Sequence, residues 1–259
     1  MKRLALDSST DRLSLAFFEG DQLLLEHQAN YSKQHGQTLV ALVQNLLNEL
    51  SWTSDQIENI TIGHGPGSYT GLRIGVSFAK VWAATLACKV EAVSSLALMA
   101  SRIPLELPES LLVPLMDARR LTAYTGAYYW QEGRLVNCIE DCHTDWTTWV
   151  KEDLIPCSQT LGLKQVVFIG EDPSDFIEAI QPDLFRAGLQ YYILTGEAAK
   201  PRVANCLSLP LTSVTDVDVL EPFYAHQSLA EQEWAQNNMA SEKQMDEKYV
   251  EQTNETNLQ

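Results

Sequence analysis

The feature that most constrains the fold of this chain is a succession of strands and helices that occurs twice. Each copy starts with three short apolar segments typical of strands and continues as helix, strand, helix and strand. In the first copy we expect strands at 2–7, 12–18, 22–28, 59–62 and 89–93, and helices at 36–50 and 71–87. In the second copy we expect strands at 111–117, 122–130, 134–141, 165–169 and 191–194, and helices at 146–154 and 173–180.

The two copies also agree in detail. A short turn joins the second and third strands of each, and Asp7 and Asp117 both stand at the end of a first strand. An antiparallel hairpin followed by α/β crossovers, present twice, is the plan of the actin-like, ribonuclease-H-like ATPase folds, in which a ligand lies between the halves. We therefore predict an α/β protein with two subdomains, each a mixed five-stranded sheet flanked by helices. The expected boundaries are 1–103 and 104–223, followed by a C-terminal helix at 224–240 that packs back and an acidic, disordered tail at 241–259.

The segment GHGPGSYTGLRIG, residues 63–75, connects an expected strand to an expected helix. Gly65 and Gly67 permit backbone angles closed to other residues, and the hydroxyls of Ser68 and Thr70 are suited to cap the helix. Converging N–H groups at a helix start can bind an anion. However, no lysine follows as in a Walker loop, and the dinucleotide motif is present only in loose form. The segment can therefore be interpreted either as a tight strand-to-helix connection or as an anion-binding site.

The net charge and the cysteines limit the functions that this chain can have. The chain has 34 acidic and 18 basic residues, a formal net charge of −16, and seven of the acidic residues lie from position 229 onward. Such a surface repels phosphate backbones, so we expect no strong nucleic-acid binding by the isolated chain. The five cysteines contain no CxxC motif and are expected to be reduced thiols. We expect no metal at Cys138, Cys142 and His143, because no second ligand pair is present.

The location follows from what the chain lacks. No run of about 18 apolar residues exists for a membrane span. A strand pattern begins within three residues of the N-terminus, which leaves no room for a signal peptide. We therefore expect a cytoplasmic protein without membrane contact.

The two helices expected in the first copy are more apolar than one sheet requires. In the second helix small residues recur at four-residue spacing and form a possible groove for another helix, while Val40 and Leu47 add a second apolar line to the first helix. Either the first helix fills this groove within the chain, or a partner subunit does. The candidate interface residues are Val40, Leu47, Arg73, Gly75, Val76, Ala79 and Ala83.

Several segments resemble the TsaB family, also called YeaZ. They are LALDSSTDRLSLAF at 4–17, GHGPGSYTGLRIGVSFAK at 63–80, VSSLALMA at 93–100, MDARR at 116–120 and EPFYA at 221–225. This family is the non-catalytic paralogue of TsaD in the bacterial system that makes threonylcarbamoyladenosine in tRNA. The resemblance implies an actin-like fold and a scaffold role without catalytic residues.

The resemblance also implies partners. TsaB proteins pair with the catalytic TsaD through the first-subdomain helices of both subunits, and the ATPase TsaE binds the assembly. TsaD transfers the threonylcarbamoyl group to the adenosine beside the anticodon in tRNAs that read codons beginning with A. We therefore expect a TsaD-like and a TsaE-like partner, a possible homodimer when the chain is alone, and tRNA contact only through the complex.

The catalytic chemistry of the paralogue is absent from this sequence. TsaD carries a metal-binding HxxxH motif after the strand that follows the long helix, and here that place holds Ser94, Ser95 and Leu96. Serine is a poor ligand for a transition metal. The five histidines stand far apart, with no HExxH motif. We therefore expect no metal site and no cofactor, and a peptidase lacks its residues.

The nucleotide site also departs from the ATPase pattern. Vestigial phosphate-turn candidates are Asp7, Ser8, Ser9, Thr10, Gly65, Gly67 and Ser68. Glu171 and Asp172 stand where a glycine-rich nucleotide turn is expected and would repel a phosphate. Arg119 and Arg120 could bind an anion or pair with local acids. The alternative function is a small-molecule kinase or ATPase that uses Asp7 for metal-bound water and Asp117 as base. A family position that is usually basic holds His226 here.

Overall fold

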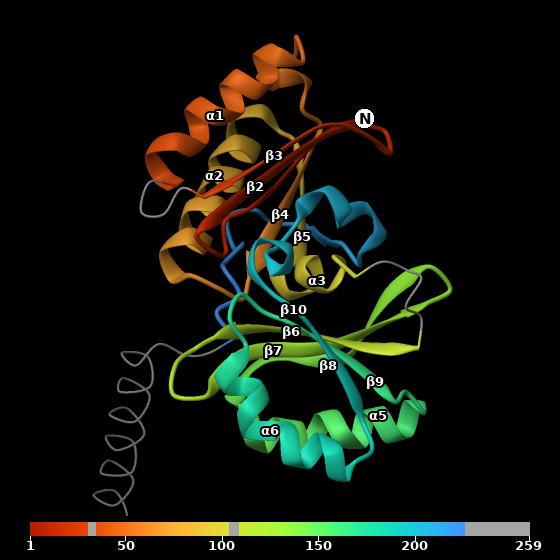
Figure 1. The fold of residues 1–259 in the computed structure, drawn as a ribbon. Helices are drawn as coiled ribbons and strands as arrows, with labels where there is room; N and C mark the ends of the chain where they lie inside the picture. Colours follow the sequence, from red (N-terminus) through yellow and green to blue (C-terminus); the bar gives the residue numbers. More distant parts are fainter. Residues whose placement is uncertain (31–34, 104–108, 226–259) are drawn as a thin grey trace, which may run out of the picture. The chain divides into compact units, whose positions relative to one another are not determined.

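The computed structural model describes residues 1–30, 35–103 and 109–225, apart from the side chains of residues 35 and 37. The first sheet has six strands in the order β11-β5-β4-β1-β2-β3 (Figure 1). Its strands are β1 (Lys2–Asp7), β2 (Arg12–Glu19), β3 (Gln22–Asn30), β4 (Asn59–Gly65), β5 (Lys89–Ser94) and β11 (Thr212–Val214). Strand β1 pairs parallel with β4 and antiparallel with β2, and its residues from Arg3 to Asp7 are all buried.

Two helices, α1 (His35–Glu49) and α2 (Tyr69–Leu86), lie side by side on one face of this sheet (Figure 1). The hydroxyl of Ser68 accepts a hydrogen bond from the N–H of Gly71 and caps the start of α2. At the other end Ala87 adopts the left-handed conformation and closes the helix. A short 3-10 turn, Ser54–Gln56, links α1 to β4.

The second sheet has five strands in the order β10-β9-β6-β7-β8. They are β6 (Ser110–Asp117), β7 (Thr122–Gln131), β8 (Arg134–Asp145), β9 (Gln165–Ile169) and β10 (Gln190–Leu194). Helices α4 (Trp146–Trp149), α5 (Ile155–Leu161) and α6 (Ser174–Arg186) pack on it, with a π-helical turn at Val150–Leu154 between the first two. Trp146 is fully buried there and contacts the rings of Trp149, Phe168 and Phe176.

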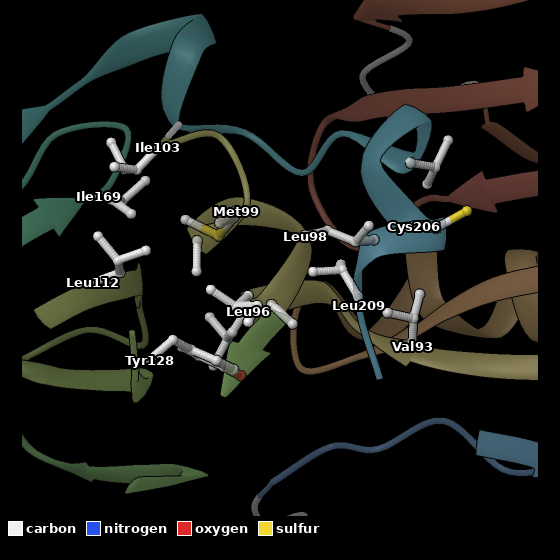
Figure 2. Close-up of a cluster of buried hydrophobic side chains, with 14 of the residues drawn as sticks. Val93, Leu96, Leu98, Met99, Ile103, Leu112, Tyr128, Ile169, Cys206 and Leu209 are labelled. Carbon is white, nitrogen blue, oxygen red and sulfur yellow. The ribbon is translucent and has the colours of Figure 1, made fainter. Parts of the chain in front are cut away.

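A short helix, α3 (Ser95–Ala100), lies between the two sheets, and all six of its residues are buried. Figure 2 shows Leu96, Leu98 and Met99 between Leu112 and Ile169 on one side and residues such as Val93 and Cys206 on the other. Cys206 lies on the 3-10 helix η4 (Val203–Ser208), which follows a shorter one, η3 (Gly196–Ala199). The apolar cluster around α3 therefore joins both sheets.

The predicted fold class is confirmed: the chain is an α/β protein with two mixed sheets on the actin-like plan. The first sheet has six strands instead of five, because β11 returns from residue 212 to pair with β5. The division into subdomains stays a prediction. The expected C-terminal helix beyond residue 225, the acidic tail and His226 lie outside the described residues.

Helices α5 and α6 run further than expected, past Pro156 and Pro182. Pro156 stands in the first turn of α5, where its missing N–H does no harm. Helix α6 continues to Arg186 because Leu184, one turn beyond Ile180, is buried on the second sheet. Among the described residues, no helix is both long and apolar enough to span a membrane.

Candidate functional site

Asp7, at the end of β1, is fully buried, and its carboxylate is committed to hydrogen bonds inside the chain. Oδ1 accepts from the N–H of Ser9 at 3.0 Å and from its hydroxyl at 2.7 Å, and Oδ2 accepts from the hydroxyl of Ser95 at 2.7 Å. Burial raises the pKa of Asp7, although these hydrogen bonds act in the opposite direction. Because both oxygens are buried and hydrogen-bonded, the carboxylate is not placed to bind a metal ion or a metal-bound water in an open cleft.

The glycine loop packs directly on the turn that follows β1. The N–H of Ser68 donates to the carbonyl of Ser9 at 2.6 Å. A Cβ at Gly67, where φ is +155°, would lie 2.4 Å from the same carbonyl oxygen, and one at Gly71 would lie 2.0 Å from the carbonyl oxygen of Ser8. These glycines therefore allow two backbone segments to approach closely. The structure brings Asp7, Ser9 and Ser68 together, and the N–H groups of Ser9 and Ser68 are bonded within this set.

A cavity of about 750 Å³ opens beside this turn, at the carboxyl ends of β1 and β6. Lys200 lines it and is only 3% exposed. Its ammonium lies 2.8 Å from Asp11 Oδ1, 3.0 Å from Glu197 Oε1 and 3.4 Å from Glu171 Oε1. Burial lowers the pKa of Lys200, but the hydrogen bonds and charges of these carboxylates outweigh it and raise the pKa, so the amine stays charged. An internal cation occupies the acidic corner of the cleft.

The repulsion expected from Glu171 and Asp172 is therefore altered by the fold. Glu171 is neutralised by Lys200, and Asp172 accepts a hydrogen bond from the hydroxyl of Ser174 at 2.9 Å at the start of α6. Sequence reasoning missed Lys200. Its only local signal is a basic residue directly ahead of Pro201, between Glu197 and Arg202.

The turn after β6 projects Arg119 into the same cavity. Arg119, Arg120 and Leu121 have φ values of 76°, 51° and 57°, three successive left-handed residues that are unusual outside glycine. Asp117 is exposed and accepts a hydrogen bond from the N–H of Arg119 at 2.6 Å. Within the described part of the chain neither arginine forms an ion pair. Asp117 lines the cavity whereas Asp7 does not. The two carboxylates that the alternative kinase or ATPase function requires therefore do not face the same cavity.

The serines that stand in place of the paralogue's histidines bond to two carboxylates, the buried Asp7 and the half-buried Asp141. Ser94 accepts a hydrogen bond from the N–H of Ala97 at the start of α3 and donates one to Asp141, which Tyr128 also contacts. Ser95 donates to Asp7. Burial is the largest cause of the raised pKa of Asp141. The described residues contain no group of three or more His, Cys, Asp or Glu side chains arranged to hold a metal.

The small residues of α2 face the chain's own sheet, which corrects the predicted interface. A Cβ at Gly75 would lie 2.5 Å from Ser8 Oγ and 3.1 Å from Ile62 Cδ1, and Ala79 is fully buried. Val76, Ala83 and Leu47 are buried as well. Small side chains let the helix lie close to the sheet, and spacing alone does not say which apolar face of a helix is inside. Of the predicted interface residues only Val40 and Arg73 are exposed.

The exposed apolar surface of these helices is a groove between α1 and α2, with a volume of about 560 Å³. Val40 is 64% and Val81 is 67% exposed, and Phe78 and Trp82 lie in ring contact with centroids 5.1 Å apart. Its apolar lining is Leu39, Val40, Ile74, Phe78, Val81, Trp82 and Leu86. The spacing of Ile74, Phe78, Val81 and Trp82 is the helical signal that could have located this face.

The two sheets, the central α3 and the cleft at the strand ends define an α/β protein of the actin-like class. The model of the family described as "TsaD: tRNA N6-adenosine threonylcarbamoyltransferase" matches residues 27–242. The Bacillus subtilis protein named "tRNA threonylcarbamoyladenosine biosynthesis protein TsaB" is 32% identical over 241 residues, which cover 92% of this chain and 99% of that protein. A protein of the same name from Escherichia coli is 30% identical over 51% of this chain and 54% of its own length.

Solved structures agree in fold. YeaZ from Pseudomonas aeruginosa has a TM-score of 0.62 at 24% identity, over 80% of this chain and 90% of that one. A second structure, described as similar to peptidase YEAZ, has a TM-score of 0.66 at 22% identity, over 87% of this chain and 99% of that one. The chain belongs to the TsaB family, as its sequence segments indicate.

Proposed function

We propose that this chain is a non-catalytic scaffold subunit required for threonylcarbamoyladenosine modification of the adenosine next to the anticodon in tRNAs that read codons beginning with A. It pairs with a TsaD-like catalytic subunit, and a TsaE-like ATPase joins the assembly. The observation that carries this proposal is the identity of 32% over 92% of the chain with a TsaB protein. With a formal net charge of −16, the chain contacts tRNA only through the complex.

The groove between α1 and α2 is the docking surface that we propose for the TsaD-like subunit. Valine side chains such as Val40 and Val81, more than half exposed, gain free energy when a partner covers them. The occupant that we propose is a relative of this chain: the TsaD family model matches residues 27–242, a range that includes all of α1 and α2, so TsaD should have corresponding helices. Two such helix pairs can pack against each other through their apolar faces.

The cleft supports the non-catalytic part of the proposal. Asp7 is buried under Ser9 and Ser95, and the N–H of Ser68 is already bonded to Ser9. A nucleotide phosphate would have to displace these internal contacts. The positively charged Lys200 is held by three carboxylates of the chain itself.

The test is pairing with the TsaD-like protein of the same genome, measured by titration calorimetry and light scattering. Val81→Arg places a charge in the groove and should weaken binding by about a hundredfold or more while the chain stays folded. Phe185→Arg is the matched control, because Phe185 is 84% exposed and belongs to α6, a helix that packs on the second sheet and does not line the groove. A homodimer of the isolated chain through the same groove would be weakened in parallel.

The reconstituted reaction with the TsaD-like and TsaE-like proteins gives the functional readout, modified adenosine in tRNA measured by mass spectrometry. Omission of this chain should abolish the product, and Val81→Arg should lower it at limiting protein. Normal modification without the chain would overturn the proposal. So would ATP turnover by the purified chain that Asp7→Ala abolishes.

A further inference from the structure

Three arginine side chains converge on one recessed surface away from the cleft. Arg12 lies on β2, Arg102 follows α3, and Arg202 precedes η4. One hollow of about 370 Å³ is lined by Arg12, Glu26, Gln28, Arg102 and Arg202. A second, of about 330 Å³, shares Arg102 and Arg202 with the first and adds Leu194, Ala198 and Asn205. Neither lining shares a residue with that of the cleft.

The carboxylates of this region are already engaged. Glu26 accepts two hydrogen bonds from Arg202, at 2.8 Å from Nε and 2.6 Å from Nη2. Glu197 contacts Arg12 at 2.9 Å and also Lys200 at 3.0 Å. Arg102 donates its Nε–H to the carbonyl of Ala198 at 2.7 Å, and it forms no ion pair with any residue that the structure describes. The hollow thus carries surplus positive charge in a chain whose formal net charge is −16.

Two further observations indicate that this charge lacks a partner. The pKa of Arg102 is lowered, first by burial and then by repulsion from Arg202 and Arg12. The Nε of Arg12 is buried without a hydrogen-bond partner among the described residues. That N–H is shielded from the hollow, and the group that can meet an anion is the guanidinium of Arg102, which lines both hollows beside Arg202.

We propose that this arginine hollow, formed by Arg12, Arg102 and Arg202 with Gln28, binds the phosphate group of a small phosphorylated molecule or free phosphate. Guanidinium groups present planar pairs of donors that match the oxygens of a phosphate. The side chains of Arg12 and Arg202 are only 16% and 36% exposed, which suits a small anion better than the extended backbone of a nucleic acid. This inference does not rest on the proposed function.

The test uses the full chain and inorganic phosphate, with binding followed by calorimetry and by the phosphorus resonance at constant ionic strength. We expect saturable one-to-one binding. Arg102→Gln should weaken it by about tenfold or more. Gln28→Glu leaves Arg102 in place and adds a competing carboxylate, and it should weaken binding similarly. Arg134→Gln, at an exposed position on β8, is the control and should bind like the natural chain.

Further probes separate the sources of the phosphate group. Adenosine monophosphate should compete with inorganic phosphate for the same site, and a short single-stranded RNA should not. Circular dichroism melting establishes that each variant is folded. Phosphate that acts no differently from chloride, or Arg102→Gln and Gln28→Glu variants that are folded and bind normally, would overturn the proposal. So would binding confined to the RNA.

Discussion

Replacing Ala79 with arginine should unfold the chain, because the face of α2 that carries Ala79 lies on the sheet. Ala79 is 0% exposed to solvent and belongs to the same apolar cluster as Leu4, Ile62 and Val76. The new side chain would have to fit into a packed layer and bring a charge with it.

The magnitude follows from two terms. Overpacking of a core position costs about 1–3 kcal/mol. A buried charge without a partner adds on the order of 3–5 kcal/mol. The loss is therefore at least about 4 kcal/mol, a large share of the ~5–15 kcal/mol by which a protein of ordinary stability is folded.

Urea unfolding followed by circular dichroism measures this loss. The matched control is Val81→Arg, two residues further on the same helix. Val81 is 67% exposed, so that substitution should lower the free energy of unfolding by about 0.5–1 kcal/mol. Gly75→Ala should fall between the two, because its new Cβ would meet Ser8 Oγ at 2.5 Å.

The refuting result is a pair of arginine variants with the same urea midpoint. Equal midpoints would mean that Ala79 does not pack on the sheet, and the small residues of α2 would again be candidates for a partner surface. An Ala79→Arg chain that is folded but fails to pair would support that original interface.

Two further predictions concern charged side chains. Burial raises the pKa of Asp7 above its ordinary 3.8, so its contribution to stability is present below pH 3.8 and is lost as pH rises through the folded pKa. The stability of Asp7→Asn relative to the natural chain should therefore rise as the pH increases above 3.8 in urea titrations, and a constant or falling difference would contradict this. Lys200→Met leaves Asp11, Glu171 and Glu197 without their cation and should lower stability by about 2 kcal/mol, since these acids are partly exposed and regain water. Salt at 1 M should shrink this loss by screening their repulsion, and a loss that salt does not change would refute the ionic explanation.

Most of the strands and helices could be predicted because their periodicity is local. The buried runs of β1 and β4 and the long apolar α2 were recognisable from residue type alone. Helix α3 could not be recognised, since six residues that are buried on every side show no amphipathic period. Strand β11 has three residues and is defined only by its pairing with β5.

The site was predicted less well. Asp7, Ser9 and Ser68, three of the phosphate-turn candidates, do lie together. Only the structure shows that Ser9 donates to the carboxylate of Asp7 and accepts from the N–H of Ser68, so that neither group is available to a ligand. The small residues of α2 were predicted to form a groove for another helix, whereas the structure packs Gly75 and Ala79 inside the chain. Both faces of that helix are apolar, and the choice depends on which one the sheet covers.

The sequence by itself determined the class of fold and the family of this chain, because strand and helix patterns and the segment 63–80 depend on neighbours in the chain. Only the tertiary structure decided where charge gathers. Lys200 meets Asp11 across 189 positions, and Arg202 meets Glu26 across 176. Electrostatic attraction depends on distance in space and on burial, and both are set by the packing of the two sheets around α3.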